Sequence, residues 1–221
     1  MEEGVRSFNY KAVLFDLDGT LVDSLPLILK TFQATMLQMD LHFNHEEVLS
    51  TVGLPLHDIC NHLGGSRGKE LFNRYLEHQD AIHDDYLDEY QGTTEMLKSL
   101  KEKGYRLGIV TSKRRVMAER GIKLTGFDSF IETLVALEDV PRAKPEAEPV
   151  LRALDNLRAN PKDAVYVGDS PFDIQCGKKA GVKTIGVTWG VSGMAKLQKE
   201  SPTDIIDNWQ QLLSFLDKQG V

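Results

Sequence analysis

Five short apolar runs, separated by longer amphipathic stretches, constrain the fold of this chain more than any other feature. Between two of the runs, Val150, Leu151, Leu154 and Leu157 recur at helical spacing. Strands that alternate with helices are typical of parallel βαβ units, so we predict an α/β fold with a doubly wound parallel sheet. The runs that we expect to form its buried strands are residues 12–16, 106–111, 132–137, 164–168 and 183–188.

Residues 22–91 interrupt this pattern directly after the first predicted strand. Apolar residues recur there at helical spacing in three segments, at 25–39, 56–63 and 71–86, and no β-branched run separates them. The insertion leaves the sheet at the carboxyl end of a strand, where open α/β sheets bind their ligands. We therefore predict an all-helical cap at 22–91, hinged at residues 21–24 and near 91–92. Residues 1–21 and 92–221 form the predicted α/β core.

Charge and hydropathy exclude several classes of partner. The 26 Lys and Arg against 33 Asp and Glu give a net charge of −7, whereas binding a phosphate backbone needs clustered basic residues. The longest uncharged stretch, 184–195, is shorter than the ~20 residues of a membrane span, and residues 1–6 show no signal-peptide core. Cys60 and Cys176 are too few for a disulfide framework. We expect a cytoplasmic protein that binds neither nucleic acid nor membranes.

Two pairs of carboxylates follow predicted strands. Asp16 and Asp18 end the first run, and because residues two apart on a strand face the same side, their charges crowd one site. Asp169 and Asp173 follow the run at 164–168. Crowded carboxylates need a cation or a proton to relieve their repulsion, and clusters with oxygen ligands alone suit Mg²⁺.

Hydroxyl and ammonium groups accompany these carboxylates. Thr111 and Ser112 end the second strand, and Lys144 precedes Pro145. Taken singly, each is more often a turn residue, strand residue or solvated charge. Together, beside a carboxylate–Mg²⁺ cluster, such donors are what a phosphoryl group requires.

These residues resemble the motifs of the haloacid dehalogenase superfamily, across essentially the whole chain. Residues 16–24 match the first motif, Thr111 the second, Lys144 in its Lys-Pro context the third, and the second acidic pair the fourth. The insertion resembles the family's helical cap, and the core its Rossmann-like fold. One departure is Ala147, where a Pro is often found.

The resemblance implies a Mg²⁺-dependent phosphohydrolase. Asp16 would be the nucleophile that forms an aspartyl-phosphate, and Asp18 the general acid and base. The metal would bind the side chains of Asp16 and Asp169 and the backbone carbonyl of Asp18. Asp173 would order metal-bound water or Lys144 without itself binding the metal.

The resemblance also implies the substrate contacts. Thr111 and Lys144 would hold the phosphoryl oxygens, and backbone N–H groups near Leu17 and Ser112 would complete the anion cradle. In the cap, the loop that begins at Gly53 resembles the family's substrate-contacting loop.

Three core stretches, 123–126, 132–140 and 143–150, look like a bacterial pyrophosphatase subgroup that is thought to act on pyrophosphate released when the phosphocarrier HPr is dephosphorylated. They are also similar to phosphoglycolate phosphatases. We expect a small phosphorylated substrate, with pyrophosphate ahead of phosphoglycolate; a sugar-phosphate phosphatase or a phosphomutase is the next alternative. The cap cations that could grip a second phosphate are Arg67, Lys69 and Arg74, although a solvated turn is the favoured interpretation of 64–69.

Other enzyme classes fit less well. A haloacid dehalogenase lacks the acid at position 18, and a phospho-acceptor signalling domain has about half this length and no inserted lid. All six histidines lie in the insertion, which excludes a Ser-His-Asp or phosphohistidine site in the core. The pairs 57/62 and 78/83 are five residues apart instead of the four that place two ligands on one helix face, so we expect surface or packing roles.

Overall fold

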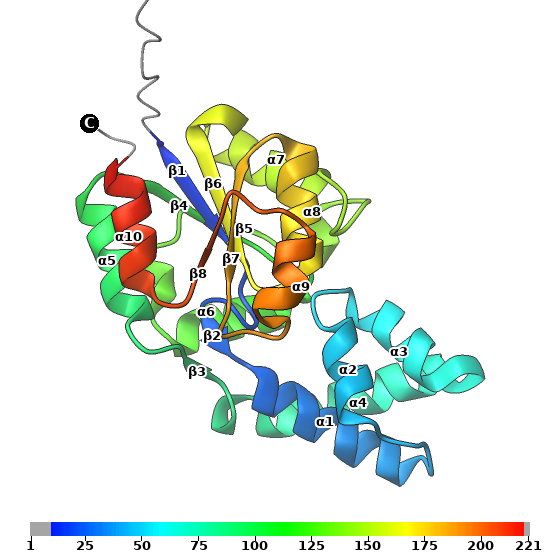
Figure 1. Cartoon of the computed structure of the whole chain (residues 1–221). Coiled ribbons are helices and arrows are strands. Elements are labelled where there is room, and N and C mark those ends of the chain that lie inside the picture. The colour runs from blue at the N-terminus through cyan, green and yellow to red at the C-terminus, as the bar shows by residue number, and fades with distance from the viewer. Residues whose placement is uncertain (1–9, 219–221) are drawn as a thin grey trace, which may run out of the picture.

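A six-stranded sheet forms the centre of the molecule in the computed structural model, which describes residues 10–218 (Figure 1). All five strand pairings are parallel, and the order is β5-β4-β1-β6-β7-β8. Residues 1–6, in which we expected no signal peptide, lie outside the described residues. The strands are β1 (Ala12–Phe15), β4 (Arg106–Val110), β5 (Thr133–Val135), β6 (Ala164–Gly168), β7 (Lys183–Val187) and β8 (Asp204–Ile206).

Helices cover both faces of the sheet, because alternate strand residues point to opposite sides. Val13 and Phe15 belong to one apolar cluster, and Ala12 and Leu14 to another. The first cluster includes residues of α5 (Thr93–Glu102), α6 (Arg115–Leu124) and α10 (Trp209–Lys218). On the other face lie α7 (Glu148–Asn156), α8 (Pro171–Ala180) and α9 (Gly193–Lys199). Figure 1 shows α5 and α10 on one side of the strands and α7 and α8 on the other. The prediction of a doubly wound α/β fold is confirmed.

Four helices make up most of the insertion: α1 (Leu25–Gln38), α2 (His45–Thr51), α3 (Leu56–Gly64) and α4 (Gly68–Ile82). They enclose an apolar cluster of their own, in which the rings of Phe32 and Tyr75 lie 4.4 Å apart. The short helix α2 was not predicted. Tyr86, which helical spacing grouped with Leu71 and Tyr75, lies beyond the end of α4 and is exposed. Figure 1 shows the insertion beside one end of the sheet.

A two-stranded antiparallel ribbon connects the insertion to the sheet. It pairs β2 (Val22–Asp23) with β3 (Asp88–Glu89), so the chain leaves and returns side by side. Each strand has only two residues, and the predicted hinges at 21–24 and 91–92 overlap or lie next to them. The division into a core and a cap that move as separate domains stays a prediction, and the predicted core includes residues outside the described range.

The position of β1 determines where a site can form. It lies between β4 and β6, and the chain proceeds outward from it in both directions, first to β5 and later to β8. Such a reversal leaves a crevice at the carboxyl ends of the central strands. None of the helices among residues 10–218 is long and apolar enough to cross a membrane.

Candidate active site

The carboxyl ends of the three central strands bring the candidate residues together. Asp16 directly follows β1, Thr111 follows β4, and Asp169 follows β6. Lys144, from the loop between β5 and α7, completes the group. All four are buried, with Lys144 only 3% exposed. Charged side chains are rarely buried unless they are paired, and each of these has polar partners.

Lys144 joins two carboxylates. Its Nζ lies 2.9 Å from Asp16 Oδ1 and donates a hydrogen bond of 2.7 Å to Asp173 Oδ1. Burial disfavours the ammonium, but the adjacent charges of Asp16 and Asp173 outweigh it and raise the pKa of Lys144. Burial raises the pKa of Asp16 well above its usual range, although Lys144 opposes this.

Asp173 has hydrogen-bond donors on both oxygens. Oδ1 accepts from the Tyr166 hydroxyl as well as from Lys144, and Oδ2 accepts from the backbone N–H and the hydroxyl of Ser170. The Ser170 bonds arise because Ser170 is the N-cap of α8 and Asp173 is its third residue, which together form a capping box. Asp173 is thereby fixed as the group that orients Lys144.

Asp169 is held more loosely. Oδ1 accepts from the Thr20 hydroxyl at 3.2 Å, and Oδ2 from the backbone N–H of Val191 at 2.7 Å. Gly19, with φ +80°, allows the loop after β1 to approach it, since a Cβ there would lie 2.3 Å from Asp169 Oδ2. Burial, followed by the charge of Asp173, raises the pKa of Asp169 to about 7.

The donor set fits a divalent cation. One oxygen from each of Asp16, Asp169 and Asp173 lies within 4.8 Å of the others, and all three residues are buried. Asp16 Oδ1 has the ion pair with Lys144 but no hydrogen-bond partner among residues 10–218, which leaves it a free lone pair. Three crowded carboxylates face one ammonium, so a hard cation with oxygen ligands would relieve their repulsion. Because each carboxylate oxygen of Asp173 already accepts two hydrogen bonds, Asp16 and Asp169 are the better placed metal ligands.

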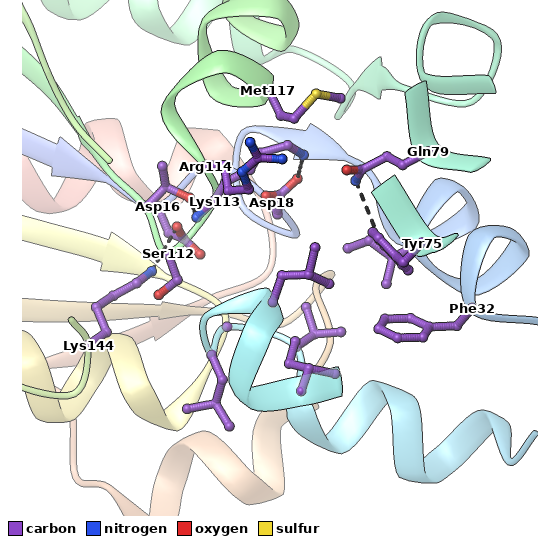
Figure 2. A pocket seen from close by; sticks show the side chains of 17 residues that line it. Asp16, Asp18, Phe32, Tyr75, Gln79, Ser112, Lys113, Arg114, Met117 and Lys144 are labelled. Carbon is purple, nitrogen blue, oxygen red and sulfur yellow. Dashed lines mark hydrogen bonds and ion pairs between the residues drawn. The ribbon is translucent and has the colours of Figure 1, made fainter. Parts of the chain in front are cut away.

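The Asp18 side chain points to a different partner. Its Oδ1 accepts a 2.6 Å hydrogen bond from the ammonium of Lys113, and Figure 2 shows this pair within the cavity described below. Burial alone would raise the pKa of Asp18, but the charge and hydrogen bond of Lys113 outweigh it and lower the pKa. Lys113 was not among the predicted site residues. Its position directly after Thr111 and Ser112 is the one signal in the sequence that could have identified it.

A small cavity of about 70 Å³ lies between the core and the insertion. Asp16, Asp18 and Lys144 line it from the core, and Gly53 lines it from the insertion. Its other lining residues from the insertion are Ile28, Phe32, Val52, Leu54, Leu56, Ile59, Tyr75 and Gln79, and those from the core are Thr111, Ser112, Lys113, Arg114 and Met117. Figure 2 shows the labelled side chains of the two parts on opposite sides of this space. The insertion therefore contributes mainly apolar surface and no charge.

The remaining predicted contacts differ in how they meet this cavity. The Ser112 hydroxyl lines it and is buried without a hydrogen-bond partner among the described residues. Gly53, with φ +103°, brings the loop of the insertion against the core, since a Cβ there would lie 3.0 Å from both Phe172 and Ser170. Leu17 packs in the core and does not line the cavity, and its carbonyl accepts the N–H groups of residues 20–22.

The cationic candidates of the insertion lie elsewhere. Arg67 and Arg74 both bind Glu70, and Arg67 also donates to the carbonyl of Met39. Lys69 is exposed, and none of the three lines the cavity. Four histidines contact polar side chains of the insertion: His57 contacts Asp58, His62 contacts Glu47, His78 contacts Gln38 and His83 contacts Asp84. Of these four, His83 is completely buried.

Comparisons with known proteins agree with this geometry. Residues 13–187 match the sequence model of the haloacid dehalogenase-like hydrolases. A Clostridium perfringens protein with the provisional name pyrophosphatase PpaX is 42% identical over 94% of this chain and 98% of its own. The pyrophosphatase PpaX of Bacillus mycoides is 37% identical, over 93% of this chain and 96% of its own.

Solved structures share the whole architecture. A provisionally assigned haloacid dehalogenase-like hydrolase from Bacteroides fragilis superposes with a TM-score of 0.86 at 27% identity, over 92% of this chain and 99% of that one. A structure from Lactobacillus plantarum, provisionally assigned as a phosphoglycolate phosphatase, gives 0.84 at 26% identity, over 93% and 99%. The family match runs from β1 through β7 and includes the insertion, and this chain belongs to the haloacid dehalogenase-like hydrolases, as a phosphatase of that family.

Proposed function

We propose that this chain is a Mg²⁺-dependent phosphohydrolase that acts through an aspartyl-phosphate on Asp16, with inorganic pyrophosphate as its preferred substrate. The observation that carries the chemistry is the arrangement around Asp16. This buried carboxylate lies beside the Lys144 ammonium at one end of a small cavity, and Asp18 lines the same cavity. A nucleophile, a phosphoryl-binding cation and a proton carrier therefore share one space.

The first half-reaction transfers the phosphoryl group. An oxygen of Asp16 bonds to phosphorus while the bond from phosphorus to the leaving oxygen breaks, and the electron pair departs with that oxygen. Lys113 keeps Asp18 a carboxylate in the free enzyme, so Asp18 takes up a proton when substrate binds and then gives it to the leaving oxygen. Lys144 and the Thr111 hydroxyl hold the other phosphoryl oxygens. The Ser112 hydroxyl, which is buried and without a partner among the described residues, is available to donate to them as well.

The second half-reaction restores the enzyme. Asp18, now a carboxylate, removes a proton from water as the water oxygen bonds to phosphorus, and the bond to Asp16 breaks. Over the whole cycle, one water and one pyrophosphate give two phosphates. Mg²⁺, held by Asp16, Asp169 and the backbone carbonyl of Asp18, would neutralise charge on the phosphoryl oxygens. Asp173 keeps Lys144 in place through its 2.7 Å hydrogen bond.

The lining of the cavity and the named relatives support pyrophosphate. The insertion lines the cavity with apolar and neutral side chains, which suits enclosing a small substrate better than holding a sugar phosphate. Relatives named as pyrophosphatases align over more than nine-tenths of this chain. Phosphoglycolate is the second candidate, because a structural neighbour is provisionally assigned to it. A sugar-phosphate phosphatase or phosphomutase ranks below both, and the cytoplasmic location stays a prediction.

Phosphate release from a panel of substrates tests the proposal. The purified chain is assayed with pyrophosphate, phosphoglycolate, a hexose phosphate and a nucleoside triphosphate, each with Mg²⁺ and with excess chelator. We expect the highest kcat/KM for pyrophosphate and none of these activities in chelator. A kcat/KM for phosphoglycolate that is about tenfold higher than that for pyrophosphate would reverse the ranking. Full activity in chelator would contradict the metal requirement.

A further inference from the structure

When pyrophosphate is cleaved, the leaving group is itself a phosphate. This anion needs a cationic partner, and the insertion does not supply one. The lining residues of the insertion are apolar except for Tyr75 and Gln79, which are neutral. Arg67 and Arg74 are paired with Glu70 outside the cavity. A cation for the leaving group therefore has to come from the core.

Three cationic residues of the core line the cavity, and they differ in their partners and in their exposure. Lys144 lies between Asp16 and Asp173, where it serves the transferred phosphoryl group. The Arg114 side chain is 34% exposed, and its Nε lies 4.0 Å from Glu138 Oε1, which is too far for a hydrogen bond. The Lys113 side chain is only 8% exposed, and its hydrogen-bonded carboxylate, Asp18, is the proposed proton carrier for the leaving group.

The position of Lys113 follows from its partner. If Asp18 delivers a proton to the leaving oxygen, that oxygen has to lie within hydrogen-bond distance of Asp18. The Lys113 ammonium is 2.6 Å from Asp18 Oδ1, so it lies next to the space that the leaving group occupies. The backbone of Lys113 is fixed because its N–H donates to the Thr111 hydroxyl at 3.1 Å, while its four-carbon side chain can rotate.

We propose that Lys113 is the leaving-group binding residue, which exchanges its ion pair with Asp18 for the oxygens of the leaving phosphate when substrate binds. The exchange moves one charge-assisted hydrogen bond and frees Asp18 Oδ1 for the leaving oxygen. Gln79 faces the Asp18–Lys113 pair from α4 (Figure 2) and lies 3.4 Å from the Tyr75 hydroxyl, so it closes this end of the cavity with a neutral amide. The inference rests on the proposed function and specifies how that function selects an anionic leaving group.

Steady-state kinetics of Lys113→Ala with two substrates tests this role. Pyrophosphate has an anionic leaving group, whereas p-nitrophenyl phosphate has an aryl leaving group without phosphate oxygens. Loss of Asp18 positioning lowers both activities, but loss of a leaving-phosphate contact lowers only the first. We expect the ratio of kcat/KM for pyrophosphate to that for the aryl phosphate to fall at least about tenfold, the size of one hydrogen bond to a charged group. A smaller fall overturns the proposal.

Two further variants complete the experiment. Lys101→Ala removes a lysine with a similar 2.8 Å carboxylate partner, Glu132, far from the cavity, and should leave the ratio unchanged. Lys113→Arg keeps the charge and should recover part of the ratio. If Lys113→Ala is poorly folded by circular dichroism, Lys113→Gln, which also removes the charge, is measured in the same way, together with its inhibition by methylenediphosphonate. An unchanged ratio and an unchanged inhibition constant in Lys113→Gln overturn the proposal.

The two proposals fail separately in this design. A wild-type enzyme that does not hydrolyse pyrophosphate refutes the proposed substrate, whatever Lys113 does. A wild-type enzyme that hydrolyses pyrophosphate, with a ratio insensitive to Lys113→Ala, refutes the leaving-group role alone. If phosphoglycolate is the better substrate, its carboxylate takes the place of the leaving phosphate, and its kcat/KM should show the same selective loss.

Discussion

Replacing Lys144 by Met removes the one ammonium that compensates two buried carboxylates. Met has a similar length and keeps most of the packing, so the loss is mainly one of charge. The Nζ lies 2.9 Å from Asp16 and 2.7 Å from Asp173, and all three side chains are at most 4% exposed. In the variant, Asp173 keeps its bonds from Tyr166 and Ser170. Asp16 Oδ1 keeps no partner among the described residues, so the cost falls mainly on Asp16.

The expected destabilisation is about 3–5 kcal/mol, the usual cost of leaving a buried charge without its partner. Typical domains have about 5–15 kcal/mol of stability, so the variant should still fold. Adding Asp16→Asn to Lys144→Met removes the uncompensated charge and should recover more than half of the loss. The matched control is Lys101→Met, whose half-exposed pair with Glu132 should cost under about 1 kcal/mol.

Urea unfolding followed by circular dichroism, in the presence of a chelator, gives these free energies. The chelator matters because a bound cation would itself compensate the carboxylates. A loss in Lys144→Met no larger than in Lys101→Met would refute the electrostatic account of the site. The same holds if Asp16→Asn further destabilises the variant, since the cost would then arise from packing.

Three more expectations concern the metal, the loop after β1 and the insertion. Phosphate release should need Mg²⁺ and be inhibited by Ca²⁺, because the looser coordination of Ca²⁺ misplaces the nucleophile. Titrations of activity with both ions check this, and full turnover with Ca²⁺ would contradict it. Gly19→Ala places a Cβ 2.3 Å from Asp169 Oδ2 and should weaken the apparent Mg²⁺ affinity of the enzyme. Gly126, at φ +74°, has open space around it, so Gly126→Ala controls for backbone strain and should leave the Mg²⁺ affinity unchanged. Burial lowers the pKa of His83 below its usual 6.5. As the pH drops, His83 therefore binds a proton in the unfolded chain before it does so in the folded protein, and the stability should fall below about pH 6.5. His83→Gln should lose part of that pH dependence in urea unfolding; an identical slope in both proteins would show that His83 does not cause it.

The sheet was largely predictable because buried parallel strands read as uninterrupted apolar runs. The strand β8 escaped because its three residues, Asp204–Ile206, include only one that is fully buried. The ribbon of β2 and β3 escaped because two-residue strands have no periodicity to detect. In both cases the strand forms by pairing with a strand elsewhere in the sequence. A pattern within the strand itself carries no information about that partner.

The part of the candidate site that directly follows the central strands could be predicted from the sequence. Asp16, Thr111 and Asp169 come together because parallel strands end at one edge of the sheet. Lys113 was missed, since its relevance depends on where one flexible side chain points. Arg67 and Arg74 were overestimated as possible substrate contacts, because Glu70, between them in sequence, binds both. Which residues of α4 face the core also depends on how the insertion packs.

Phosphate release from pyrophosphate by purified Asp16→Asn tests the central claim most directly. An amide is a poor nucleophile and also removes a charge from the metal site, so we predict that turnover falls below detection while the circular dichroism spectrum stays that of the wild type. Asp155→Asn, the same change at an exposed position, is the control and should keep full activity. More than about a tenth of the wild-type rate in Asp16→Asn would mean that under about 1.4 kcal/mol of transition-state stabilisation was lost. That result would contradict the assignment of Asp16 as the nucleophile.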